Sequence, residues 1–262
     1  MNIVTFVKHV PSSAVTPRIS DSKDRIEEEG LSYEVNEPDL YAIEEALEQR
    51  SVHHGTVTSI VVGPARAKEA LHLAYAKGVD HAIHVIDEDF RGTNSSITVR
   101  AAAELVRKLG PDMIFAGIQA DDDLQGQFGV ALAEALGLPA ITAVTEIRVS
   151  PREKVATVIR ELGAGFKEEI EVDLPCVFTI QFGIRALRYT SVMSIVRSRA
   201  RKLESLGIKA LGIAPDEFRP GSQLRVVELF YPEKSGKCEQ IDGSPEEAAR
   251  KLVQNLVTAG VI

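Results

Sequence analysis

Cysteine is scarce in this chain. The two cysteines, Cys176 and Cys238, are too few to build a disulfide scaffold. Both are expected to be free thiols in a reducing compartment, and Cys176, which follows Pro175 inside an apolar run, is expected to be a small core residue. No cysteine or histidine pair has the spacing of metal ligands, so the sequence predicts no metal site of that kind.

Excess positive charge and long apolar runs are also lacking. The net charge of -8 argues against nucleic acid as the main partner. No apolar run approaches the roughly 20 residues of a membrane-spanning helix, so an integral membrane protein is not expected. The N-terminal segment MNIVTFVKHV has neither the basic region nor the long apolar region of a signal peptide, and we expect a cytoplasmic protein.

In the first half of the chain, apolar strand-like runs alternate with helix-like segments. The predicted strands are 2–8, 56–63, 81–86 and 112–117, and the predicted helices are 36–50, 64–78, 94–110 and 125–137. These strands are apolar throughout, which indicates a parallel sheet with helices on both faces. Ligands of such sheets bind at the carboxyl ends of the strands, so the loops after Lys8, Val62 and Ala116 are candidate sites.

The second half has a different pattern. Segments 143–150, 154–162 and 165–180 are expected to be antiparallel strands, and 192–206 a short basic helix or arm. An extended arm over 224–243 precedes a C-terminal helix, 244–260, whose Ser244 and Glu247 form a capping box. Segment 12–30 is too long for an ordinary loop and is expected to carry a function or a small hairpin. The predicted fold class is α/β: a Rossmann-like doubly wound parallel sheet, a smaller antiparallel sheet, and a C-terminal extended arm and helix.

The stretch FAGIQADDDLQGQFG, residues 115–129, is the main candidate site. Its consecutive aspartates could bind a hard metal ion, but adjacent side chains cannot easily all face one ion, and the spacing of a calcium loop is absent. A solvated acidic loop is a second reading. The third reading is a nucleotide-binding loop. Gly117 would let the backbone leave the sheet, and Gly126 and Gly129 would allow the backbone to approach a ligand closely. A helix starting near Gln127 would offer free N–H groups to a phosphate. The aspartates would then bind hydroxyls or cap that helix.

Two further segments border the same edge of the predicted sheet. Asn36 is expected to cap the helix that follows it, and Gly63-Pro64 forms a tight turn after a strand. Each of these two segments is consistent with an ordinary strand–helix connection or with one wall of a nucleotide site. The chain contains no Gly-x-Ser-x-Gly elbow and no metal-ligand set, so a hydrolase is disfavoured and no catalytic residue is expected.

Seven segments, taken together in order and spacing, resemble the beta subunit of electron-transfer flavoprotein over essentially the whole chain: VKHVP, NEPDLYAIEEAL, VVGPARAKEAL, AKGVDHAIHV, GIQADDDLQGQFG, LPCVFTIQFGIRALRYTS and YPEK. The resemblance implies a heterodimer in which an alpha subunit holds most of an FAD and this chain binds an AMP of structural role. It also implies electron transfer from flavin dehydrogenases of the acyl-CoA type to an acceptor such as a membrane quinone oxidoreductase. Residues 1–215 would be the nucleotide-binding domain, and 216–262 an arm and helix that pack on the alpha subunit.

The resemblance also implies site residues. Those lining the AMP would be Phe6, Asn36, Glu37, Pro38, Asp39, Val62, Gly117, Gln119, Ala120, Asp122, Asp123, Leu124, Gln125, Gly126, Gln127 and Phe128. By family position, Ser12, Ser13 and Pro38 would lie nearest the flavin. Those recognising partner dehydrogenases would be Arg188, Tyr189, Val192 and Ile195. Val192 stands where the family has an exposed leucine anchor; the alternative is a buried residue at a helix start.

The chain departs from the family pattern at several positions. The nucleotide loop commonly ends in Gln-Thr-Gly or Gln-Val-Gly, whereas here Phe128 adds bulk beside the phosphate. Electron-bifurcating relatives bind a second FAD at the AMP position, with a loop resembling Asp-Gly-Asp-Thr; Leu124 replaces its second acid, which favours AMP. The usual proline of the recognition loop is Met193, so the sequence does not identify the partner. The alternatives are a bifurcating beta subunit with a second FAD and NADH, and an AMP-sensing regulatory module.

Overall fold

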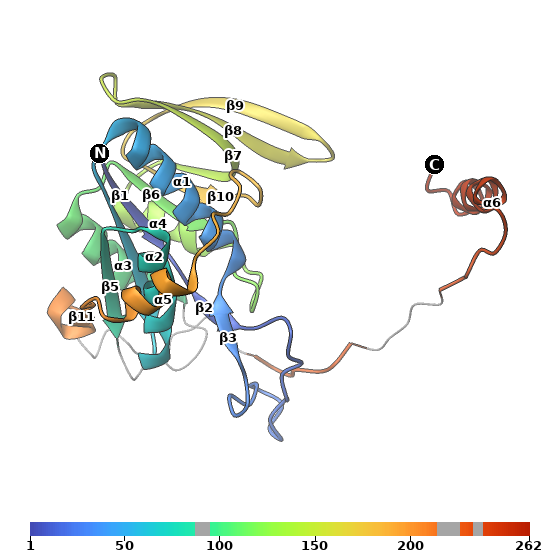
Figure 1. The fold of residues 1–262 in the computed structure, drawn as a ribbon, viewed down its shortest axis with the longest axis horizontal. Coiled ribbons are helices and arrows are strands. Elements are labelled where there is room, and N and C mark those ends of the chain that lie inside the picture. The colour runs from blue at the N-terminus through green and yellow to red at the C-terminus, as the bar shows by residue number, and fades with distance from the viewer. Residues whose placement is uncertain (87–94, 214–225, 233–237) are drawn as a thin grey trace.

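The computed structural model describes residues 1–86, 95–213, 226–232 and 238–262 (Figure 1). Its body is a nine-stranded sheet in the order β11-β5-β4-β1-β6-β10-β7-β8-β9. From β11 to β7 neighbouring strands are parallel, and β8 and β9 continue the same sheet in antiparallel fashion. The strands are β1 (Asn2–Phe6), β4 (Thr56–Gly63), β5 (His81–Ile86), β6 (Met113–Gly117), β7 (Ala140–Ser150), β8 (Val155–Gly163), β9 (Phe166–Asp173), β10 (Cys176–Ile180) and β11 (Glu204–Gly207).

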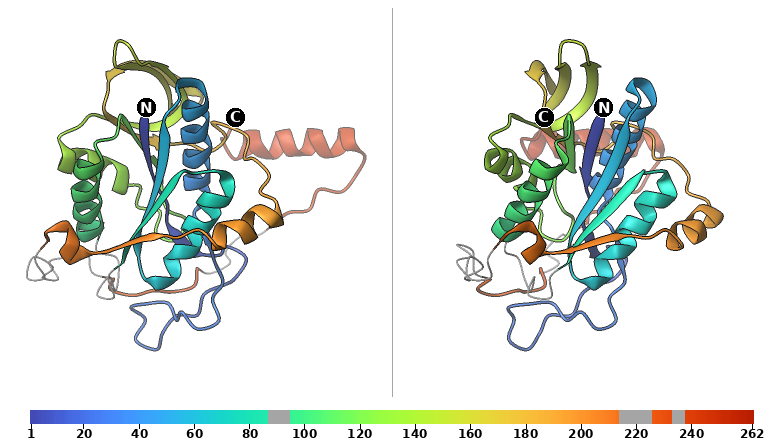
Figure 2. Two further views of the ribbon diagram at one scale, coloured as in Figure 1. Left: turned by 60° about the vertical axis from the view of Figure 1, so that its left-hand side comes forward. Right: turned by 90° about the vertical axis from the view of Figure 1, so that its left-hand side faces the viewer.

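Helices cover both faces of the parallel part, with the blue and cyan helices on one side and the green helices on the other (Figure 2). On the first face lie α1 (Glu37–His53) and α2 (Lys68–Lys77), and on the second lie α3 (Ser95–Leu109) and α4 (Phe128–Leu136). The remaining helical elements are α5 (Val192–Arg199), which packs on α2, α6 (Pro245–Thr258), and the short turns η1 (Ala65–Ala67) and η2 (Ile208–Leu211). None of the helices within the described ranges combines the length and apolar character needed to cross a bilayer.

The two-sided burial explains why the strands are apolar throughout. In β1 and just after it, Ile3 and Val7 belong to the core under α1 and α2, whereas Val4 and Phe6 belong to the core under α3 and α4. Successive side chains of a strand point to opposite faces, so a strand covered on both sides is mostly apolar, and its buried polar residues pair with each other, as the Thr5 and Ser59 hydroxyls do at 2.6 Å. The predicted doubly wound α/β fold is confirmed.

Two predicted elements of the second half were wrong in detail. Segment 165–180 is two strands, β9 and β10, and β10 lies parallel between β6 and β7 instead of extending an antiparallel sheet. Segment 192–206, expected to be a short basic helix or arm, is helical only as far as Arg199, and its last residues belong to the edge strand β11. An apolar run shows that a strand is buried, but it does not specify which strand lies beside it.

The small hairpin predicted within segment 12–30 is present in a modified form. Strands β2 (His9–Pro11) and β3 (Tyr33–Val35) flank the segment and pair as a separate antiparallel sheet. The segment between them contains one further antiparallel bridge, from Ile19 to Ile26.

Part of the predicted arm, 224–243, contacts the segment between β2 and β3, which we call the excursion. The Leu229 N–H donates to the carbonyl of Lys23 at 2.7 Å, and the Tyr231 hydroxyl donates to the carbonyl of Pro17 at 3.0 Å. The predicted capping box of α6 is confirmed by the reciprocal hydrogen bonds between Ser244 and Glu247. The expected boundary at 215/216 lies outside the described residues.

Replacing Phe178 with alanine should destabilise the chain by about 3–5 kcal/mol, because a fully buried ring would leave a cavity. Phe178 also packs edge-to-face on Phe115, with ring centroids 5.6 Å apart. The matched control is Phe166→Ala at the exposed β8–β9 turn, which should change the free energy of unfolding by less than about 0.5 kcal/mol. Equilibrium urea unfolding measures both; equal effects would contradict the core assignment.

Candidate functional site

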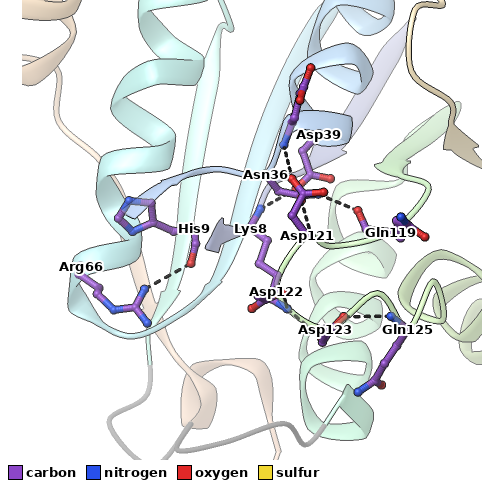
Figure 3. A network of polar contacts seen from close by, with 11 residues as sticks. Lys8, His9, Asn36, Asp39, Arg66, Gln119, Asp121, Asp122, Asp123 and Gln125 are labelled. Atoms are coloured by element: carbon purple, nitrogen blue, oxygen red, sulfur yellow. Dashed lines mark hydrogen bonds and ion pairs between the residues drawn. The ribbon is translucent and has the colours of Figure 1, made fainter. Parts of the chain in front are cut away.

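The candidate site lies where the chain reverses direction across the sheet. From β1 the chain adds β4 and β5 on one side, and then adds β6 on the other side of β1. The connections after β1 and β6 therefore lead to helices on opposite faces of the sheet, and the strand ends between them are the usual ligand position in a doubly wound sheet. Residues around Lys8, the start of α1 and the loop 118–127 meet there (Figure 3).

Asp39 joins three elements at these strand ends. Its carboxylate accepts a hydrogen bond from the backbone N–H of Lys8 and another from that of Gly117, each at 2.8 Å. The carboxylate is buried, and burial raises the pKa of Asp39 to about 7 despite the two N–H donors, which favour the charged form. The first turn of α1 is thus fixed to the ends of β1 and β6.

Gly117 is required by this packing. A Cβ at position 117 would lie 2.6 Å from the Cβ of Pro38 and 2.5 Å from a carboxylate oxygen of Asp39. The sequence suggested that Gly117 frees the backbone to leave the sheet. In the structure its missing side chain instead makes room for the start of α1.

Asn36 ties α1 to the loop after β6. Its side-chain Nδ2 donates to the carbonyl of Gln119 at 2.9 Å, and its Oδ1 accepts the N–H of Asp121 at 2.9 Å. The expectation that Asn36 caps α1 with its side chain was wrong, although it occupies the cap position. The Asp121 carboxylate accepts the N–H of Glu37 at 3.3 Å instead, so loop and helix bind each other reciprocally.

The three consecutive aspartates have separate partners. While Asp121 faces α1, the ammonium of Lys8 lies 2.6 Å from Asp122 and 3.0 Å from Asp123. Burial lowers the pKa of Lys8, but the two carboxylates outweigh it and the pKa is raised. Asp123 also accepts the N–H of Gln125 at 3.1 Å. No cluster of three or more metal-ligand side chains occurs within the described ranges.

The N-terminus of α4 opens toward the same loop. No side chain caps it, so the expectation that the aspartates cap this helix was wrong. Its first-turn N–H groups carry partial positive charge, which suits a phosphate. The loop reaches it through left-handed residues, Leu124 at a φ of 51° and Gly126 at 60°, and Leu124 is exposed.

Aromatic packing closes one side of the site. The rings of Phe6 and Phe128 meet edge-to-face with centroids 5.0 Å apart. Val62 and Phe128 both pack against the core to which Phe6 belongs. The ring of Phe128 therefore packs against Phe6. The backbone N–H of Phe128, at the start of α4, does not depend on the size of this side chain.

A cation and two rings flank the site on the side of the small sheet. The guanidinium of Arg66 stacks 3.7 Å above the centre of the Tyr33 ring and donates to the carbonyl of His9 at 3.3 Å. His9 Nδ1 and Arg66 Nε are buried and have no hydrogen-bond partner among the described residues. Burial, with the nearby Arg66, lowers the pKa of His9, so its ring favours the neutral form.

The structure brings most of the expected nucleotide residues together around the ends of β1 and β6 and adds others. Lys8 was missing from the expected set, and Asp121 was included only as part of the loop 117–128. Lys8 lies two residues after β1 at the strand-end position where ligands bind, and a nearby cation reduces the mutual repulsion of a triple aspartate, so both signals were in the sequence. Ser12 and Ser13 lie on the excursion between β2 and β3, where the N–H of Ser13 donates to Glu34 at 3.0 Å.

The residues expected to recognise partners lie around the start of α5. Tyr189 is 88% exposed and Val192 is 69% exposed, so the alternative reading of Val192 as a buried residue was wrong. Ile195 is half-buried, and Arg188 forms an ion pair with the buried Glu44. Met193 and Val196, which lie within the expected recognition loop 188–197 but were not among its named contact residues, complete an exposed apolar face.

Comparison with known proteins connects these features. Residues 25–205 match the protein family described as "Electron transfer flavoprotein domain". The chain is 30% identical over 257 residues to the electron transfer flavoprotein subunit beta of Methylophilus methylotrophus, covering 97% of each, and 32% identical over 257 residues to that of Clostridium acetobutylicum, covering 98% of each. It is 31% identical over 270 residues to the protein FixA of Sinorhizobium fredii, covering 99% of this chain and 93% of that protein.

The Asp39 carboxyl should make stability depend on pH. Because its folded-state pKa of about 7 lies above the ordinary value of 3.8, the folded chain retains a proton that the unfolded chain loses at lower pH. The free energy of unfolding, compared with that of Asp39→Asn, should therefore fall as the pH rises from about 4 to about 7 and level off above that. Urea unfolding at a series of pH values measures the difference; parallel curves for the two proteins would refute the raised pKa.

Proposed function

The chain belongs to the electron transfer flavoprotein family, among its beta subunits and FixA proteins, and from this premise we propose that it is the beta subunit of a heterodimeric electron carrier. The heterodimer would accept electrons from flavin dehydrogenases of the acyl-CoA type. It would deliver them to an acceptor such as a membrane quinone oxidoreductase, without bifurcation. The expected cytoplasmic location stays a prediction.

The FAD, held mainly by the alpha subunit, would supply the reversible uptake of electrons. This chain would contribute binding surfaces and rigidity, and no residue of it is proposed to be catalytic. Ser12, Ser13 and Pro38 are proposed to lie nearest the flavin.

The observation that carries the proposed nucleotide site is the uncapped N-terminus of α4 beside a loop already held in place. Asn36 fixes the loop to α1, and Lys8 neutralises part of the charge of Asp122 and Asp123. An anionic phosphate at the helix N-terminus would then meet N–H donors and little repulsion from the aspartates. Loop residues 117–128, the start of α1, Phe6 and Val62 are proposed to line the nucleotide.

Two residues support AMP over a second FAD in this site. Leu124 occupies the position of the second acid in the loop that electron-bifurcating relatives use, and its side chain is exposed. Phe128 packs on Phe6 and fills space on the core side of the loop. A structural AMP that binds beside this already positioned loop is therefore the proposed ligand.

The surfaces for protein partners are proposed on two other parts of the chain. The C-terminal helix α6 has no buried residue, and its exposed apolar side chains, among them Leu252, Val253 and Val257, would pack on the alpha subunit. The exposed face of Tyr189, Val192, Met193 and Val196 would receive the flavin dehydrogenase.

The nucleotide content of the purified heterodimer tests the proposed function. Co-expression with the alpha subunit, denaturation and chromatography of the released nucleotides should give a single FAD and a single AMP per heterodimer. Two FAD without AMP would establish the bifurcating alternative in its place. A complex without flavin would contradict electron transfer, and AMP that exchanges freely and alters partner affinity would indicate a regulatory module.

Replacing Lys8 with methionine should weaken AMP retention by about three- to tenfold, because Asp122 and Asp123 would lose their shared cation beside the phosphate. The matched control is Lys23→Met, which breaks an exposed pair with Glu228 remote from the loop and should leave AMP content unchanged. AMP per heterodimer after dialysis is the readout. Equal AMP content in the two variants would remove Lys8 from the site.

A further inference from the structure

Two adjacent carboxylates on α1, Glu44 and Glu45, are buried in the middle of the helix. Their side chains are only 3% and 0% exposed. A buried carboxylate is strongly unfavourable unless cations or hydrogen-bond donors face it. The partners of these two residues therefore show what the arrangement holds in place.

Glu44 binds one cation from α2 and one from the strap, the segment 181–191 between β10 and α5. The ammonium of Lys77, itself buried, lies 2.8 Å from Glu44 Oε1. The guanidinium Nε of Arg188 donates to Glu44 Oε2 at 2.5 Å, and the Arg188 backbone N–H donates to Oε1 at 3.2 Å. Glu44 thus binds both the side chain and the backbone N–H of one strap residue, Arg188.

Glu45 holds the strap at a second residue, one helical position further along α1. Arg185 Nε donates to Glu45 Oε2 at 2.7 Å, and Gln49 Nε2 donates to Oε1 at 2.6 Å. Arg185 and Arg188 are three residues apart, so the strap is fixed to α1 at both ends of a short span.

Apolar contacts hold the strap less extensively. Ile184 packs partly against the core, and the Phe182 ring meets Tyr41 at a centroid distance of 5.9 Å. Leu187 and Tyr189 are exposed. Because buried ion pairs add little net stability over apolar packing but require a defined geometry, the charged contacts specify where the strap lies.

The strap leads directly into the exposed face at the start of α5. Ser191, three residues after Arg188, caps α5: its hydroxyl accepts a hydrogen bond from the N–H of Ser194 at 3.1 Å. The other end of α5 rests on α2, where Arg201 stacks 3.8 Å above the Tyr75 ring. The strap therefore positions the start of the apolar face formed by Tyr189, Val192, Met193 and Val196, while the packing of α5 on α2 positions its other end.

We propose that Glu44, Glu45, Lys77, Arg185 and Arg188 form a charge clamp that positions this face for a flavin dehydrogenase. Arg188 is then a positioning residue that acts through the strap, and not a direct contact of the partner. The inference rests on the proposed function for the identity of the partner, whereas the clamp itself depends only on the contacts above.

Amide hydrogen exchange of the intact heterodimer tests the clamp without any partner. In Arg188→Met, Glu44 keeps Lys77, so the fold should persist while amides of residues 184–191 exchange roughly tenfold faster. The control Arg148→Met removes an exposed cation of β7, which pairs with Glu146 on β7 and Glu169 on β9, and should leave this exchange unchanged. Unchanged exchange in Arg188→Met would overturn the clamp.

The kinetics of reduction by a purified acyl-CoA dehydrogenase test the docking role. Arg188→Met and Glu44→Gln should each raise the KM for the heterodimer by roughly three- to tenfold, with kcat and the FAD and AMP content unchanged. Arg148→Met, which changes the net charge by the same amount as Arg188→Met, should leave the KM unchanged. A further variant, Arg188→Lys, should restore part of the affinity, because a cation can still reach Glu44.

The outcomes separate the clamp from the proposed function. A raised KM in Arg188→Met but not in Glu44→Gln would make Arg188 a direct contact and overturn its positioning role. Faster exchange with an unchanged KM would overturn the docking role of this face. If no acyl-CoA dehydrogenase reduces the wild-type heterodimer, the proposed function and the docking role fail together, while the exchange result still decides the clamp.

Discussion

The attachment of Asp39 to the ends of β1 and β6 is the contact on which the rest of the site depends. A single carboxylate accepts the N–H groups of Lys8 and Gly117, which follow and end the two strands at the point where the chain reverses across the sheet. The start of α1 can approach so closely only because Gly117 has no side chain. Once α1 is fixed, Asn36 can hold the loop after β6 and Lys8 can reach its aspartates. Contacts within the chain itself thus hold the acidic loop in place.

The same helix connects two regions that are separate in function. The first turn of α1 holds the proposed nucleotide loop, and its middle holds the strap through Glu44 and Glu45. An α-helix of 17 residues is stiff along its axis because each turn is hydrogen-bonded to the next. A nucleotide bound at the start of α1 would therefore stabilise the helix that also holds the strap. This is a physical reason why the AMP proposed for this site would be structural and tightly held.

The chain also carries surfaces that its own fold leaves uncovered. The helix α6 is closed by a capping box, yet it buries none of its residues, and the exposed face at the start of α5 is apolar. A helix that forms locally but has no core to pack on is expected to bind another surface. The two uncovered surfaces fit the two partners proposed for a beta subunit: one permanent, on α6, and one transient, at α5.

Local and repetitive features were predictable from the sequence, and contacts between distant residues were not. Apolar strands alternating with amphipathic helices determined the doubly wound fold, and Ser244 with Glu247 determined the start of α6, because both signals act within a few residues. The neighbours of β10, the reason for Gly117, the partners of Asn36 and the ion pairs of Arg188 were decided only by the tertiary structure. Those contacts join residues far apart in the chain, such as Lys8 and Asp122 at a separation of 114 positions or Arg188 and Glu44 at 144. Side-chain patterns show which residues need a partner, but only the packing of the sheet and helices decides which partner lies within hydrogen-bonding distance.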